Sequence, residues 1–178
     1  MLLLTRILAL CSSFLALNST AETLSFIGSV NSTTCDVKLE VGGSATNVVN
    51  LGSVGLNAPP DPSNLVHFSL KPDLTQAGCA GLTSQNTVTI SWMGNFNVDS
   101  FGFKGLLGAQ SGNATDAAIY WTYEREPWPA QFVTRDTPFI TIPGDDFLKM
   151  GAQFNVLLIP GRLAGTFQSA AAYVMSYN

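Results

Sequence analysis

The chain has 178 residues, and its 12 acidic and 8 basic side chains give a formal net charge of −4. This length suffices for one domain with a proper hydrophobic core. The acidic balance argues against a nucleic-acid partner, because binding to phosphates needs a basic face.

The first segment, residues 1–21, has the pattern of a cleaved secretory signal. Arg6 supplies an early positive charge, an apolar run follows over residues 7–17, and small residues precede the expected cleavage site after Ala21. The run is too short to cross a bilayer. We therefore expect an exported protein whose mature part is a single domain, residues 22–178.

The mature part keeps two cysteines, Cys35 and Cys79. An even number of cysteines in an oxidising export route indicates a disulfide. It would close a loop of about 45 residues and stabilise the fold by about 4 kcal/mol in the chain-entropy model. A metal site is the alternative, but it would need carboxylate ligands because His67 is the only histidine. We expect neither a metal nor a cofactor.

Short segments of alternating polar and hydrophobic residues recur along the chain, separated by turns rich in glycine and proline. This rhythm, with only 11% charged residues, predicts an all-β sandwich. No segment shows a sustained helical period, although residues 106–118 are ambiguous. The predicted strands are residues 24–30, 37–41, 66–70, 87–92, 118–123, 139–142 and 154–159.

The last residues, 165–178, predict one uninterrupted strand that ends the chain. One of its faces is apolar at a period of two, whereas the other is mixed and small. An edge strand of this kind invites pairing with another chain, although it could also simply end a closed sandwich. The apolar face carries Phe167, Ala171, Tyr173, Met175 and Tyr177.

A candidate ligand loop follows the strand at residues 118–123. Trp128 stands between two prolines and offers a rigid ring for stacking on a sugar, while Glu124 and Arg125 could supply hydrogen bonds. The alternative is that Trp128 packs over the end of the sandwich. Trp92 and Trp121 lie within predicted strands, so we expect them in the core.

The sequence gives little support for an enzyme. No Gly-x-Ser-x-Gly nucleophile motif accompanies His67, which lies on the polar side of its predicted strand. The neighbouring acids Asp145 and Asp146 are expected in a solvated turn and not in an acid–base pair.

Several segments together resemble the type 1 fimbrial pilin family. Residues 23–35, with an aromatic-x-Gly-x-Val pattern before Cys35, are similar to the opening of a pilin domain, and residues 68–70 resemble the strand that leads to the family's second cysteine. Gly165 is fourteenth from the end and Tyr177 is penultimate. Both offsets match the C-terminal motif that periplasmic chaperones recognise in such subunits.

The resemblance implies a subunit of a chaperone–usher fimbria on the cell surface, with an incomplete immunoglobulin-like sandwich. A periplasmic chaperone would lend a strand to an open groove, and the N-terminal extension of a neighbouring subunit would replace it during assembly at the outer-membrane usher. The chaperone and donor-strand interface would include Gly165, Phe167, Ala171, Tyr173, Met175 and Tyr177.

The position in the fibre stays open. Cleavage after Ala21 leaves three residues ahead of Ser25 and Phe26, a span of about 10 Å that is too short for a donor strand and would place the subunit at the tip. Cleavage after Ser13 would instead free a donor and give an ordinary subunit. At the tip, loops would bind any host glycan or protein receptor.

A second interpretation is a stand-alone secreted lectin-like or receptor-like β-sandwich that binds glycans.

Overall fold

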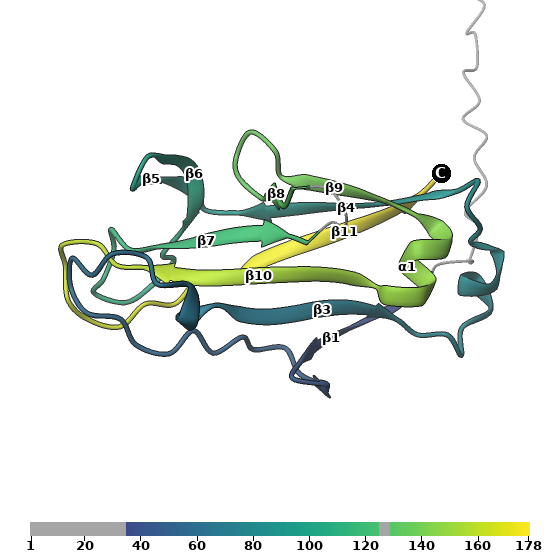
Figure 1. The fold of residues 1–178 in the computed structure, drawn as a ribbon, viewed down its shortest axis with the longest axis horizontal. Coiled ribbons are helices and arrows are strands. Elements are labelled where there is room, and N and C mark those ends of the chain that lie inside the picture. Colours follow the sequence, from purple (N-terminus) through teal and green to yellow (C-terminus); the bar gives the residue numbers. More distant parts are fainter. Residues whose placement is uncertain (1–34, 125–128) are drawn as a thin grey trace, which may run out of the picture. The chain divides into compact units, whose positions relative to one another are not determined.

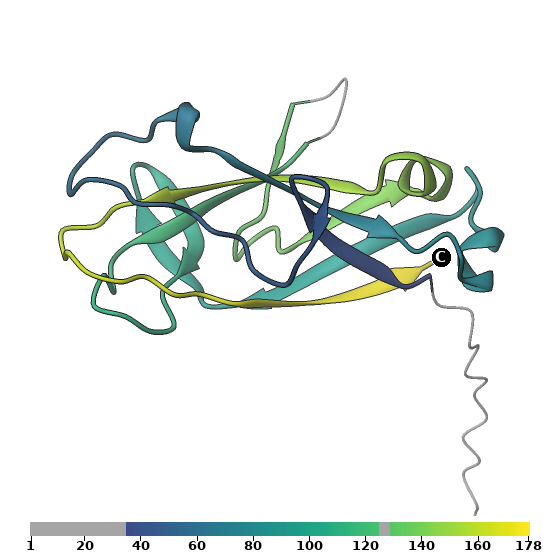
Figure 2. The same cartoon turned by 90° about the horizontal axis from the view of Figure 1, so that it is seen from below.

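The structure is a computed structural model that describes residues 35–124 and 129–178. The predicted signal, the predicted strand at residues 24–30 and the pilin-like segment before Cys35 lie outside this part of the chain. The described residues fall within one compact unit, Asn31–Asn178, and form two antiparallel sheets with a shared core (Figures 1 and 2).

The larger sheet has the strand order β2-β1-β3-β10-β7-β6-β5, and β8 also pairs with β7. Its strands are β1 (Val37–Val41), β2 (Ser44–Ala45), β3 (Val66–Pro72), β5 (Phe96–Ser100), β6 (Phe103–Gly108), β7 (Ala118–Tyr123), β8 (Gln131–Phe132) and β10 (Ala152–Ile159). The smaller sheet has the order β11-β4-β9, with β4 (Thr87–Gly94), β9 (Phe139–Pro143) and β11 (Ala171–Tyr177). The expected all-β immunoglobulin-like sandwich is confirmed.

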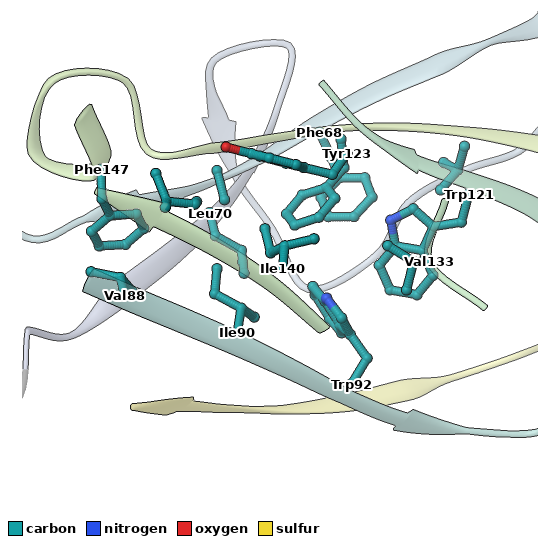
Figure 3. Packing of buried hydrophobic residues seen from close by; sticks show 14 of the residues in the cluster. Phe68, Leu70, Val88, Ile90, Trp92, Trp121, Tyr123, Val133, Ile140 and Phe147 are labelled. Carbon is teal, nitrogen blue, oxygen red and sulfur yellow. The ribbon is translucent and has the colours of Figure 1, made fainter. Parts of the chain in front are cut away.

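The core lies between the two sheets because each strand turns alternate side chains inward. Val88, Ile90 and Trp92 of β4 are at most 5% exposed and face side chains of the larger sheet (Figure 3). Trp92 and Trp121 contact each other edge to face, with ring centroids 4.5 Å apart. Both tryptophans are therefore core residues, as predicted.

The predicted disulfide is confirmed. Cys35 and Cys79 are bonded, and each is 2% exposed. The bond joins the residue that leads into β1 to the short 3-10 helix η2 (Ala77–Gly81). The other 3-10 helix, η1 (Pro62–Asn64), precedes β3.

One short helix was not predicted. Asp145 and Asp146 lie in the first turn of α1 (Gly144–Met150) and not in a solvated turn. Acidic residues favour a helix N-terminus, Lys149 forms an ion pair with Asp145 at 3.1 Å, and Phe147 is fully buried. Seven residues are too few to show a helical period in the sequence. No helix in the described ranges is both long and apolar enough to span a bilayer.

The expectation of one uninterrupted final strand is wrong at its start. β11 begins at Ala171, and the residues before it bond elsewhere: Ser111 pairs with Gln168, the Ala114 N–H donates to the Thr166 carbonyl, and the Ser169 hydroxyl donates to Gly108. Residues 165–170 therefore cross from the smaller sheet to the residues that follow β6.

Candidate functional site

An open groove lies beside β11, between the two sheets, with a volume of about 1020 Å³. Residues 47–56 line one side and residues 163–171 line the other, while the floor includes Phe68, Trp92 and Trp121. No charged side chain lines the groove among the residues that the structure describes. A smaller hollow of about 370 Å³ adjoins it between β1 and the start of β11, where Lys38 is the charged lining residue. The groove is thus uncharged and has aromatic rings at its base.

The inward face of β11 is only half-buried. Its residues alternate strictly between partly buried and exposed, and those on the inward face pack against the core. In the neighbouring strand β4 the inward residues Val88 and Ile90 are fully buried. The sandwich is therefore less well covered along β11 than along β4. The partly buried residues, including one ahead of the strand, are Phe167, Ala171, Tyr173, Met175 and Tyr177.

The backbone of β11 has an open edge. Thr87 and Asn178 exchange both of their hydrogen bonds, so by the alternation of an antiparallel ladder the β11 residues at even positions bond to β4. The N–H and C=O groups of Ala171, Tyr173, Met175 and Tyr177 point away from β4. Among the described strands β11 pairs with β4 alone. The β11 residues whose side chains pack against the core are therefore those whose backbone is available at the edge.

The C-terminal end of β11 lies beside the disulfide, beyond the residues that line the groove. The Tyr177 hydroxyl donates a hydrogen bond to the Cys35 carbonyl, next to the disulfide, so β1 and β11 converge there (Figure 2). Burial raises the pKa of Tyr177, and the nearby charge of Asp36 acts in the same direction. Tyr177 therefore remains a hydrogen-bond donor at neutral pH.

At the groove end lined by residues 163–165, two loops make close contacts. The Asp116 carboxylate accepts hydrogen bonds from the N–H groups of Arg162 and Leu163 at 2.7 and 3.2 Å, and these bonds lower its pKa, the Arg162 contact most. Gly165 has a φ of +145°, and a Cβ there would lie 2.5 Å from the Cβ of Asn113. Glycine is thus required where the chain enters the crossing segment.

The candidate ligand loop is described only in part. Glu124 follows β7, its side chain is 47% exposed, and it accepts a hydrogen bond from Asn155 Nδ2 at 2.6 Å. Arg125 and Trp128 lie outside the described residues, so their role stays a prediction. His67 is exposed, with its Nδ1 atom 3.9 Å from Glu124 Oε1.

Two features of the site were not predicted from the sequence. One is the groove wall formed by residues 47–56, and the other is the pair of hydrogen bonds that Asp116 accepts from Arg162 and Leu163. The wall forms no regular strand, although Val49 and Leu51 pack against the core. Its signal was the uncharged stretch of valines and leucines between Val48 and Leu56. The role of Asp116 had no local signal, because its partners lie 46 and 47 residues away in the sequence.

Comparison with known proteins points to fimbriae. No protein-family model matches the chain. The F107 fimbrial protein of Escherichia coli is 28% identical over 173 residues, which cover 93% of this chain and 96% of that relative. The K99 fimbrial protein of Escherichia coli is 30% identical over 112 residues, or 62% of this chain and 56% of that relative. The chain is thus a homologue of fimbrial proteins, and its resemblance to the fimbrial pilin subunit family is confirmed.

Proposed function

We propose that the protein is a non-enzymatic structural subunit of a chaperone–usher fimbria, and that the groove beside β11 accepts a β-strand from another molecule. One observation carries this proposal. Along β11 the residues with half-buried side chains are the same residues whose backbone groups face the open edge.

This coincidence is what strand addition requires. An added strand would bond to the outward N–H and C=O groups of Tyr173, Met175 and Tyr177, which gives affinity that does not depend on sequence. Alternate side chains of the added strand would point into the sandwich and cover the floor at Trp92 and Trp121. Each Val, Leu, Ile or Phe side chain that becomes fully buried stabilises the complex by about 1.5–3 kcal/mol.

The uncharged lining indicates what the donor strand carries. A charged side chain placed in the trough would lose water without gaining an ion pair, because no lining residue among those described is charged. The inward positions of the donor are therefore apolar or small. In the assembly order implied by the family resemblance, a periplasmic chaperone supplies the first strand and a neighbouring subunit replaces it at the usher.

The predicted export signal and the tip position are separate parts of the proposal. Both concern residues 1–34, which lie outside the described residues, and the first described strand begins at Val37. The mass of the exported protein tests both. A mature start at Glu22 supports the predicted cleavage site, whereas an earlier start supports an ordinary subunit that carries its own donor strand.

The first experiment uses a matched pair of substitutions on β11. Ala171 is partly buried and lines the groove, whereas Ala172 is exposed on the opposite face. We expect Ala171→Asp to abolish recovery of the one-to-one complex with a periplasmic fimbrial chaperone, and Ala172→Asp to leave the yield within about twofold of wild type. Equal yields for the two variants would contradict strand insertion at this groove.

Hydrogen exchange in the chaperone complex provides a residue-resolved test. The amides of Ala172, Val174 and Ser176 bond to β4 and are protected in either case. We expect the amides of Tyr173, Met175 and Tyr177 to be protected as well, because an added strand would bond to them. Protection at the even positions alone, or abundant monomer that unfolds cooperatively without a chaperone, would favour a closed stand-alone sandwich.

A further inference from the structure

The outer face of the smaller sheet carries no charge. No residue of β4, β9 or β11 is acidic or basic, although the whole chain has 12 acidic and 8 basic side chains. Val88, Ile90 and Trp92 are buried in the core, so the alternate side chains of the sheet point away from the core. These residues form the outer face: Thr89, Ser91 and Met93 of β4, Phe139 and Thr141 of β9, and Ala172, Val174 and Ser176 of β11.

Large apolar side chains are exposed together on the outer face. Met93 is 59% exposed, Val174 is 57% exposed and Phe139 is 48% exposed. Val174 and Phe139 flank Ser91 in one row across the sheet, and Met93 is paired with Ala172 in the next row. Large side chains therefore stand beside small ones. This pattern allows two copies of the face to interdigitate, as the facing sides of two packed sheets do.

The β9 edge of the same sheet is protected against a partner strand. The Trp92 N–H donates to the Pro138 carbonyl, so by the alternation of the ladder the β9 residues at even positions bond to β4. Among the residues at odd positions, the Phe139 carbonyl already accepts a hydrogen bond from Gln131 Nε2 at 2.7 Å, and Pro143 has no N–H. A partner on this side of the molecule would therefore meet the outer face and not the edge.

The charge pattern indicates a second copy of this chain as that partner. The formal net charge of the chain is −4, so two copies repel each other where charged surfaces meet. Contact between two outer faces removes no charged group from water and therefore avoids the cost of burying one. A partner that binds through its charge, such as a basic peptide, finds no opposite charge on this face.

The size of the outer face indicates a weak contact. At about 3.4 Å per residue and about 4.8 Å per strand, the seven residues of β11 and the width of three strands give an area of about 340 Å². A stable interface buries about 800 Å² on each partner. One contact is therefore too small for a stable dimer, whereas identical contacts repeated along two fibres would add up.

We propose that the outer face of the smaller sheet contacts the same face of a second copy of this chain, and that repeated contacts of this kind join fimbriae side by side. The second part rests on the proposed function. A strand added beside β11 would widen the same sheet without covering its outer face. The contact between fibres is thus separate from strand addition within a fibre.

The test is photo-crosslinking from the centre of the outer face, on the chaperone complex and on assembled fimbriae. Ser91→Cys labelled with benzophenone maleimide is compared with labelled Ser63→Cys, an exposed position in η1 outside the smaller sheet. Cys35 and Cys79 are bonded to each other, so they do not take up the label. We expect at least tenfold more covalent dimer of this chain from position 91 than from position 63. The yield should rise with salt, because screening weakens the repulsion between the copies.

A charge placed on the outer face tests the contact in a second way. Val174→Lys in the labelled protein should lower the dimer yield at least tenfold, whereas Leu74→Lys, at a residue 67% exposed and outside the smaller sheet, should not. Mixing Val174→Lys with Val174→Glu should restore the dimer, because the two charges attract each other. Recovery of the chaperone complex checks that each variant is folded.

Equal dimer yields from the two labelled positions in both preparations would overturn the proposal. An unchanged yield with Val174→Lys, or no restoration by the mixed variants, would also overturn it. A product with the chaperone or with residues 1–34 of the same chain, in place of the dimer, would assign the face to that partner instead. Failure of the proposed function is distinguishable, because the protein would then form no chaperone complex, and the dimer would be measured on the free protein.

Discussion

Replacing Gly165 with alanine tests whether close packing at the groove end lined by residues 163–165 holds β11 in place. The backbone there has a φ of +145°, and a Cβ atom would lie 2.5 Å from the Cβ of Asn113 and 3.3 Å from its Cα. Residues other than glycine rarely adopt this backbone conformation, which costs them about 1–3 kcal/mol. The overlap adds a further cost of about 1–3 kcal/mol, because the backbone must shift.

We therefore expect Gly165→Ala to lower the free energy of unfolding by about 2–6 kcal/mol. The control is Gly42→Ala, where φ is +58° and nothing lies within 4 Å of the added Cβ. This control carries the cost of a left-handed conformation alone, about 1–2 kcal/mol. The difference between the two variants then reports the contact with Asn113 together with the rarer backbone conformation at Gly165.

The assay is urea unfolding of each variant in complex with its chaperone, followed by the fluorescence of the buried tryptophans. If Gly165→Ala and Gly42→Ala lose the same stability, the loops that carry Gly165 and Asn113 do not pack as closely as the structure indicates. β11 would then not be held in place by these contacts. A change in the slope with urea would instead mean that the compactness of the folded or unfolded state had changed.

Two further predictions concern residues near the disulfide. Tyr177→Phe removes the hydrogen bond to Cys35, a residue only 2% exposed. It should lower the free energy of unfolding by about 1–3 kcal/mol, because it leaves the Cys35 carbonyl unsatisfied. Tyr173→Phe, on the same face, should cost less, and equal losses in urea unfolding would contradict the role of the Tyr177 hydroxyl. Hydrogen bonds from Lys38 and Thr75 lower the pKa of Asp73 from 3.8 to about 2. The contribution of Asp73 to stability is therefore present above pH 4 and is lost as the pH falls toward 2. In pH-dependent unfolding, Asp73→Asn should reduce the loss of stability at acid pH, whereas Asp136→Asn should not.

The strands with strong local patterns could be predicted from the sequence. The predicted ranges 37–41 and 118–123 coincide with β1 and β7, because β-branched and aromatic residues alternate there between well-defined turns. β5 and β6 were missed. They are joined at Phe101 and Gly102, both with positive φ, and their pairing shifts register twice. Bulges break the period of two from which a strand is recognised.

The geometry of the candidate site depended on contacts that no local pattern encodes. The apolar face of β11 was visible at a period of two, but the beginning of the strand was not. Residues 165–170 leave the ladder because Ser111 and Ala114 supply other partners, more than 50 residues away. An alternating pattern shows which side chains share a face, but it does not show where the backbone finds its partners.

The two fixed ends of β11 explain how an open edge can be specific. A free edge strand that moved would accept a partner in several registers, and a slip of one residue would turn every inward side chain outward. β11 is tied at one end by Tyr177 to Cys35 and is preceded at the other by the bridge between Gln168 and Ser111. Its outward N–H and C=O groups therefore keep defined positions relative to the groove lining at Trp92 and Trp121. Such preorganisation lowers the entropy lost on binding. An incoming strand that places small or apolar side chains over Trp92 and Trp121 would therefore bind in preference to one shifted by a single residue.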